Sequence, residues 1–228
     1  LQYCENNPKD SWKINVEMPL QIAKVARATN TQFITFSTEY IYDGEISAPK
    51  DESRSNMMPR STYAYQKYIM EKEIEAANTN TAIMRLPKTY NHHYQGNFIC
   101  NYILGLKQSK RQSSQYIAAD QIYSPLSCEA LARVVYEIIK RKVNGTFNCG
   151  GPDDLSRYEY IRYMIDTCKF ESNIERADLW EITGDKNLPR NTAMDSSALY
   201  SLIDFIPESI LEYIVIYAEE LKCLKESH

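Results

Sequence analysis

The chain has 228 residues, 43% of them hydrophobic, and a formal net charge of −4 at pH 7. This length and composition predict a globular protein with a substantial core, built as one domain or as two closely joined lobes. The acidic balance and the lack of a Lys/Arg-dense run argue against a nucleic-acid partner, and no apolar run approaches the length that spans a membrane. Six scattered cysteines without a C-x-x-C pair favour reduced thiols in the cytoplasm over a zinc site or a disulfide framework.

Helical and strand patterns alternate along the sequence. The predicted helices cover 19–28, the segment of Tyr63, 96–107, 128–142, a segment capped by Ser156 that ends at Thr167, 196–202 and 207–221. The predicted strands cover 33–36, 81–86, 116–118 and the beginning of 145–152. This order indicates an α/β protein in which a parallel sheet carries helices on both faces.

Thr38, Tyr63 and Lys67 carry the chemistry that the sequence indicates. Tyr63 and Lys67 are four residues apart and share one face of a helix, where the ammonium stabilises a phenolate. Tyr63 then becomes a proton donor near neutral pH, and the hydroxyl of Thr38, at the end of a strand, holds a carbonyl oxygen against the phenol. The pattern is typical of redox chemistry between carbonyls and alcohols.

The spacing alone is not specific. Tyr68 with Lys72 and Tyr136 with Lys140 repeat it, but neither pair follows a strand-ending hydroxyl motif at a short distance. A strand-terminal threonine also satisfies backbone groups, and an exposed helical pair also has this spacing. The context of Thr38 selects Tyr63.

Several further motifs follow one another in a fixed order. They are Glu5–Pro8 with Asn15-Val16, Phe36–Gly44 (similar to S-T-D-Y-V-F-x-G), Tyr63–Glu71 (similar to Y-G-K-T-K-x-x-G-E), Gly96–Phe98, Asp120-Gln121 with Pro125, and Pro189–Asn191. In this order they resemble the extended short-chain dehydrogenase/reductases, and among them the dTDP-4-dehydrorhamnose reductase family. The resemblance covers almost the whole chain.

The resemblance implies a Rossmann-like, doubly wound parallel sheet with a smaller C-terminal substrate-binding lobe. Residues 1–90 are then the remainder of a dinucleotide-binding domain, and residues 91–228 form mainly the lobe, with segments around 115–150 returning to the sheet. The family's Gly-rich turn, which brings backbone close to a pyrophosphate, has no counterpart, since the first glycine is Gly44. The N-terminal Gly-rich βα unit is therefore expected to be absent, either because the sequence is a fragment or because the protein is truncated.

The resemblance also implies an activity, which is the transfer of a hydride from NADPH or NADH to the 4-keto group of a nucleotide-linked deoxysugar. The implied residues are Thr38, Tyr63, Lys67 and Asn15 for catalysis, Tyr63, Lys67 and Pro87 for the cofactor, and Thr38, Glu39, Tyr40, Gln121 and Arg190 for the substrate. Asn15 would support a proton-relay water. A homodimer is the implied assembly.

Four of these residues also fit a plainer interpretation. Asn15 suits a helix cap, Tyr40 a packed tyrosine at a strand edge, and Arg190 a solvated arginine in a loop. Gln121 is equally ambiguous, because the family's D-Q-x-G-x-P-T stands at 120–126 without its glycine and threonine. This departure leaves the identity of the sugar open.

A histidine pair, His92-His93, raises the question of a metal. It has no nearby cysteine and no histidine partner four residues away, so no metal ligand is assigned.

Three other segments resemble the regulatory β subunit of methionine adenosyltransferase, a non-catalytic member of the same branch that keeps a dinucleotide fold. Arg85–Tyr90 is similar to R-I-P-I-L-Y, Gly145–Phe147 to G-T-F, and Pro189–Asp195 to P-R-N-x-x-L-D. This alternative implies a methionine adenosyltransferase catalytic subunit as partner. A nucleotide-sugar epimerase would keep the same triad, and the choice of NADP over NAD stays open.

Overall fold

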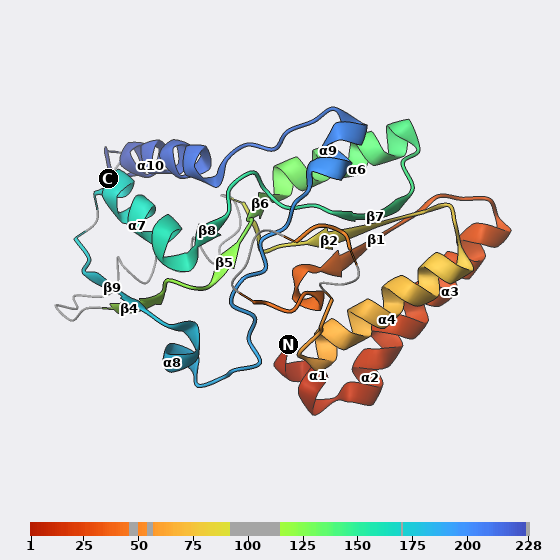
Figure 1. Ribbon diagram of the computed structural model, residues 1–228. Coiled ribbons are helices and arrows are strands. Elements are labelled where there is room, and N and C mark those ends of the chain that lie inside the picture. Colours follow the sequence, from red (N-terminus) through yellow and green to blue (C-terminus); the bar gives the residue numbers. More distant parts are fainter. Residues whose placement is uncertain (46–49, 54–56, 92–114, 170, 227–228) are drawn as a thin grey trace.

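A parallel three-stranded sheet lies at the centre of the computed structural model, which describes residues 1–45, 50–53, 57–91, 115–169 and 171–226 (Figure 1). Its order is β1–β2–β7, with β1 at Phe33–Thr38, β2 at Thr81–Leu86 and β7 at Gly145–Asn148. The register pairs the last residues of β1 and β2 with each other. Residues that follow these two strands therefore leave the sheet at the same edge, and the predicted parallel α/β fold is confirmed.

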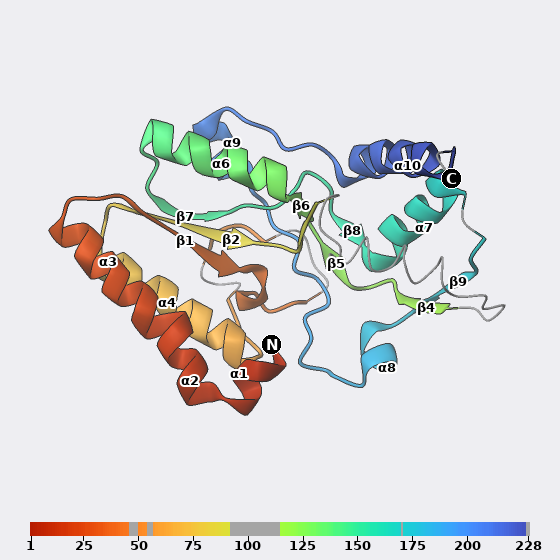
Figure 2. The same ribbon diagram turned by 180° about the vertical axis from the view of Figure 1, so that it is seen from behind.

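One face of the sheet is covered by the N-terminal helices and by α4, Thr62–Ala77 (Figures 1 and 2). The N-terminal layer consists of α1 (Gln2–Asn6), α2 (Pro8–Trp12), a π-helical segment η1 (Lys13–Glu17) and α3 (Met18–Ala28). Helical structure thus begins earlier than the predicted 19–28, because Pro8 and Pro19 both occupy first-turn positions that need no backbone N–H. Ala23 packs against Met70 and Ile83, which joins α3, α4 and β2.

The opposite face is covered by α6 (Cys128–Arg141) and α9 (Ser197–Ile203), close to the predicted bounds. Ser127 caps α6 by accepting the N–H of Ala130 at 3.0 Å. Val134 and Ile138 then face Met84 of β2 in one core cluster. Helices on both faces of the sheet make the doubly wound arrangement that the sequence predicts.

Short strand pairs and three further helices make up the remaining secondary structure of the described residues. The pairs are β3 (Thr89–Tyr90) with β6 (Leu126–Ser127), β4 (Gln115–Ala118) with β9 (Ile174–Ala177), and β5 (Ile122–Tyr123) with β8 (Leu155–Ser156). The helices are α7 (Arg157–Cys168), α8 (Leu179–Thr183) and α10 (Ile210–Glu226). The strand predicted at 116–118 pairs with β9 rather than with the central sheet.

Side-chain caps decide where two of these helices begin. Ser156 and Glu159 form a capping box at the start of α7, as the predicted cap requires. Asp153 accepts the N–H of Ile210 at 2.9 Å, so α10 begins there and not at the predicted Pro207. The predicted helix at 96–107 and the pair His92-His93 lie outside the described residues. Within the described ranges, every helix is too short or too polar to cross a bilayer.

Gly44 connects the central sheet region to the loop that follows α8. Its carbonyl accepts the N–H groups of Arg190 and Asn191, each at 3.1 Å. Its φ is +72°, and a Cβ at this position would lie 2.3 Å from the Cβ of Pro189. The two parts of the molecule therefore approach here more closely than a side chain allows.

We expect Gly44→Ala to lower the free energy of unfolding by about 2–5 kcal/mol. The left-handed conformation contributes about 1–2 kcal/mol and the overpacking against Pro189 about 1–3 kcal/mol. Gly184→Ala is the matched control, because Gly184 has a φ of +69° but no atom within 4 Å of its Cβ position. Urea unfolding of both variants measures the difference, and equal losses would contradict the close approach.

Candidate active site

Thr38 and Tyr63 meet where β1 ends and α4 begins. Thr38 is the last residue of β1 and is 8% exposed, and Tyr63 is the second residue of α4. The hydroxyl of Thr38 lies close enough to the Tyr63 phenol to lower the pKa of that phenol. Thr38 Oγ1 also accepts the N–H of Tyr40 at 3.3 Å and opens the short helix η2 (Glu39–Ile41). The threonine thus contacts the phenol and satisfies a backbone group.

Two caps fix the first turn of α4, and with it the position of Tyr63. Ser61 Oγ accepts the N–H of Ala64 at 3.2 Å. The carboxylate of Glu5, from α1, accepts the N–H of Thr62 at 2.7 Å and its hydroxyl at 2.6 Å. A carboxylate at a helix N-terminus is also favoured by the helix dipole.

Burial raises the pKa of the Tyr63 phenol above its usual value, the hydrogen bond with Thr38 lowers it, and Cys4 and Glu39 add smaller upward contributions. Tyr63 is therefore a protonated phenol at neutral pH, the form that can give a proton to a developing alkoxide. Of the described groups, Lys67 is not among those that shift the pKa of Tyr63 in this conformation. The lowering of that pKa by Lys67 stays a prediction for the occupied site.

Lys67 lies one turn beyond Tyr63 and faces the central sheet. Its Nζ donates to the carbonyl of Phe36 at 2.9 Å and contacts Met70 Sδ at 3.7 Å. Burial lowers the pKa of Lys67, while the neighbouring Glu71 raises it. The ammonium keeps a further N–H that a ligand hydroxyl can accept.

Asn15 ties the π-helical segment to α4. Its Nδ2 donates to Gln66 Oε1 at 2.8 Å and contacts Cys4 Sγ at 3.6 Å. Gln66 in turn donates to Ser11 Oγ at 2.9 Å. Asn15 lies inside the helical run and not at its end, so it is no helix cap. It sits against the residue that precedes Lys67, and its part in a proton relay stays a prediction.

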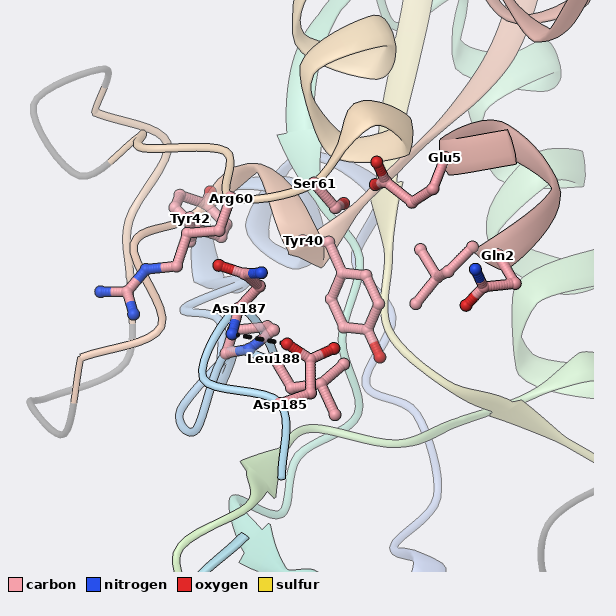
Figure 3. Close-up of a pocket in the computed structure, with 11 residues that line it drawn as sticks. Gln2, Glu5, Tyr40, Tyr42, Arg60, Ser61, Asp185, Asn187 and Leu188 are labelled. Carbon is pink, nitrogen blue, oxygen red and sulfur yellow. Dashed lines mark hydrogen bonds between the residues drawn. The ribbon is translucent and has the colours of Figure 1, made fainter. Parts of the chain in front are cut away.

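A cavity of about 150 Å³ opens beside this constellation, at the N-terminus of α4 (Figure 3). Its lining includes Leu1, Glu5, Tyr40, Arg60, Ser61 and Asn187. The ring of Tyr40 projects between α1 and the loop 185–188 (Figure 3). A cavity of about 150 Å³ accommodates one six-membered ring. The predicted substrate residue Tyr40 therefore lines a hollow of ring size, and burial raises its pKa.

Glu39 follows Thr38 and is 3% exposed. Burial raises the pKa of its carboxyl from 4.5 to about 8, and the charge and the backbone N–H of Lys88 act in the opposite direction. Pro87 is buried at the end of β2, on the same edge of the sheet. Gln121 is also buried, in the turn before β5.

The raised pKa of Glu39 predicts a pH dependence of stability. Between pH 4.5 and about 8, the folded protein keeps a proton on Glu39 that the unfolded chain releases. The contribution of this group to the free energy of unfolding therefore falls as the pH rises through that window. The glutamine of Glu39→Gln cannot ionise. The free energy of unfolding of this variant, compared with that of the unsubstituted protein, is therefore expected to be more favourable at about pH 8 than at about pH 5. Urea unfolding at both pH values checks this, and an unchanged difference would contradict the raised pKa.

Arg190 is already engaged by residues in and around α8 and before β5. Its guanidinium lies 4.2 Å from the centroid of the Trp180 ring and 3.7 Å from the carboxylates of both Asp120 and Asp178. It is therefore not a solvated loop arginine, and a diphosphate would have to compete with two carboxylates for it. Its predicted contact with the substrate stays a prediction.

The other pairs with the same spacing are arranged differently. The ammonium of Lys72 lies over the Tyr68 ring at 4.2 Å, and that of Lys140 lies 5.8 Å from the centroid of the Tyr136 ring. Within the part of the chain that the structure describes, no cluster of three or more His, Cys, Asp or Glu residues could hold a metal ion.

Three features of the site were missed by the sequence analysis. They are the cap from Glu5 to α4, the Glu39–Lys88 contact, and the contribution of the loop 185–189 to the cavity. Glu5 and Thr62 are 57 residues apart, so no local sequence pattern indicates their hydrogen bond. A charged residue within two positions of the end of each of two adjacent parallel strands is the signal that could have indicated the second feature.

A model of the family described as the RmlD substrate binding domain matches residues 1–222. The chain belongs to the RmlD substrate-binding domain family. The resemblance seen in the sequence is thereby confirmed. Among its curated relatives, the bovine methionine adenosyltransferase 2 subunit beta is 24% identical over 203 residues, which are 87% of this chain and 60% of the relative.

A second relative is a dTDP-4-dehydrorhamnose reductase of Sinorhizobium fredii, 25% identical over 170 residues, which are 71% of this chain and 55% of the relative. This RmlD-family chain therefore spans less than two thirds of the length of either relative. The dTDP-4-dehydrorhamnose reductase of Bacillus anthracis, solved in complex with NADP, superposes with a TM-score of 0.84 at 20% identity and covers 96% of this chain and 76% of its own. The Rossmann-like fold class is thus confirmed.

Proposed function

We propose that the protein is a reductase that transfers a hydride from NADPH or NADH to the 4-keto group of a nucleotide-linked deoxysugar. The contact between Thr38 and the protonated phenol of Tyr63, with Lys67 one turn away, carries this proposal. Membership of the RmlD substrate-binding domain family and the reductase activity named for the Sinorhizobium relative support it.

The hydroxyls of Thr38 and Tyr63 have different roles at the carbonyl oxygen. Nicotinamide supplies the hydride to the carbonyl carbon when the cofactor is bound. Thr38 Oγ1 orients the oxygen, and Tyr63 Oη gives it a proton, so the carbonyl becomes a secondary alcohol. The effect of the Thr38 hydroxyl on the pKa of Tyr63 supports a site in which both groups act on one oxygen atom.

The residues present fit one end of the cofactor. Lys67 and Tyr63 would hold the nicotinamide ribose, because the partly buried ammonium has an N–H beyond the one given to Phe36. Pro87 lies at the same edge of the sheet and would contact the ring. The chain contains no Gly-rich turn for the pyrophosphate, so its own residues account for the nicotinamide end alone.

The cavity beside α4 supports a sugar as the reacting group. It has a volume of about 150 Å³, which suits one six-membered ring. Ser61 lines it and stands two residues before Tyr63, and Tyr40 lines it and stands two residues after Thr38. A ring seated there would lie beside the segments that carry Thr38 and Tyr63, which do not themselves line the cavity.

The proposal is tested with the full-length protein, by following NADPH oxidation with dTDP-4-dehydrorhamnose as substrate and cofactor binding by thermal shift. We expect the cofactor to raise the melting temperature and the sugar nucleotide to trigger its oxidation. Absence of both effects would overturn the proposal.

A second candidate function is that of a regulatory subunit. The match to the bovine methionine adenosyltransferase 2 subunit beta over 87% of this chain favours it. Cofactor binding without turnover, together with stable binding to a methionine adenosyltransferase catalytic subunit in gel filtration, would indicate this function and exclude the reductase.

A further inference from the structure

The phenol of Tyr42 lies at the centre of a buried polar network beside the cavity. Tyr42 is fully buried, at the wall of the cavity (Figure 3). Its Oη accepts a hydrogen bond from Arg85 Nη1 at 3.0 Å. The same hydroxyl reaches two acceptors, Asn148 Oδ1 at 2.6 Å and the carbonyl of Asp51 at 3.0 Å. Burial raises the pKa of Tyr42 to about 12, so the phenol keeps the proton that it donates at neutral pH.

This network connects Tyr42 to the helix that carries the reacting groups. Arg85 donates from Nε and Nη2 to the two carboxylate oxygens of Glu71, at 3.1 and 2.9 Å. Glu71 belongs to α4 and stands four residues after Lys67, on the same face of the helix. One buried ion pair therefore joins the wall of the cavity to the helix of Tyr63 and Lys67.

Tyr42 is also connected to the opposite wall of the cavity. Gly44, two residues after Tyr42, accepts the N–H groups of Arg190 and Asn191, each at 3.1 Å. These two residues directly follow Pro189, which lines the cavity. A stretch of three residues, anchored at one end by the Tyr42 phenol, thus holds both walls together.

The hydroxyl of Tyr42 is a feature of this chain's own sequence. In the run Phe36–Gly44, which is similar to S-T-D-Y-V-F-x-G, a tyrosine stands where that pattern has a phenylalanine. A phenylalanine offers Arg85 no acceptor and Asn148 no donor. Packing of the ring alone therefore does not require the hydroxyl.

We propose that Tyr42 is a positioning residue for the reduction, whose hydroxyl fixes the cavity relative to Tyr63 and Lys67 and so orients the sugar ring toward the proton donor. The inference rests on the proposed function, because it places the reacting ring in the cavity. Thr38 and Tyr63 do not line the cavity, so the alignment of a ring with them depends on how the wall is anchored. A displacement of about 1 Å can lower a reaction rate about 100-fold, so a smaller shift of this wall still changes turnover.

The test is steady-state kinetics of Tyr42→Phe in the full-length protein, with Tyr200→Phe as the matched control. Tyr200 lies in α9, on the other face of the sheet, and its phenol also donates a hydrogen bond, to the carbonyl of Gly150. We expect Tyr42→Phe to lower kcat and kcat/KM for dTDP-4-dehydrorhamnose equally, by about tenfold, because orientation is lost while the substrate still binds. Tyr200→Phe should be less stable to urea but keep both constants.

A second measurement does not depend on turnover. Hydrogen exchange of the backbone N–H groups of Arg190 and Asn191 reports how often their bonds to Gly44 open. We expect this exchange to be about tenfold faster in Tyr42→Phe, as the loss of one buried hydrogen bond implies, and unchanged in Tyr200→Phe.

The two measurements separate this inference from the reductase activity. An unchanged kcat for Tyr42→Phe in an active protein would overturn the positioning role, and the hydroxyl would then stabilise the fold alone. Unchanged hydrogen exchange would overturn the connection between Tyr42 and the cavity, whether or not the protein is active. If the unsubstituted protein does not oxidise NADPH, the reductase is contradicted, and faster exchange in Tyr42→Phe would still support the connection.

Discussion

Tyr63→Phe in the full-length protein is expected to lower kcat for reduction of the keto sugar by about 100- to 10,000-fold. Proton transfer from a positioned side chain contributes an effect of this size, and phenylalanine keeps the ring but has no proton to give. Folding should change little, because a single hydrogen bond, the one with Thr38, is lost, which is worth about 0.5–1.5 kcal/mol. Steady-state NADPH oxidation and urea unfolding measure the two effects.

Tyr65→Phe provides the control for this variant. Tyr65 lies on the same helix two residues further on, and it is 51% exposed. It should therefore keep full activity. If Tyr63→Phe turned over the substrate as fast as Tyr65→Phe, the Tyr63 phenol would not be the proton donor.

Glu71→Leu is expected to lower the free energy of unfolding by about 3–5 kcal/mol. Glu71 and Arg85 form a salt bridge of 2.9 Å in which both side chains are 2% exposed. Removing the carboxylate takes away the opposite charge of the salt bridge while the Arg85 guanidinium stays buried. The guanidinium keeps its hydrogen bond to the Tyr42 hydroxyl, at 3.0 Å, which does not neutralise its charge. Urea unfolding measures the loss.

The double variant Glu71→Leu/Arg85→Met separates the unpaired charge from the loss of the bridge itself. Replacing both partners by apolar groups removes the uncompensated charge, so most of the stability should return. Asp166→Ala is the surface control, since its pair with Arg162 is about half exposed and is worth less than about 1 kcal/mol. A double variant as unstable as Glu71→Leu would show that the buried charge is not the cause.

The parts of the fold that could be predicted have a strong local pattern. The apolar run of β2 and the helical spacing of α6 each identify an element with nearly correct bounds. The two-residue strands β3, β5, β6 and β8 are too short to show any period. The partner of β4 could not be predicted either, because β9 lies more than fifty residues away in the sequence.

The same distinction explains which parts of the site were foreseen. Thr38 and Tyr63 each belong to a recognisable run of residues, and the fold brings the two together as the motifs imply. The cap from Glu5 and the pairing of Glu39 with Lys88 depend on which strands and helices become neighbours. Such contacts follow from the tertiary arrangement and not from any local pattern.

The most direct test of the proposed reductase follows a deuterium atom. Full-length protein is supplied with NADPH that carries deuterium at the transferable position and with dTDP-4-dehydrorhamnose, and the product is examined by NMR. The proposed function predicts deuterium on C4 of the product sugar, in proportion to the NADPH oxidised. NADPH and sugar nucleotide that both bind but leave the sugar unlabelled and unreduced would contradict it.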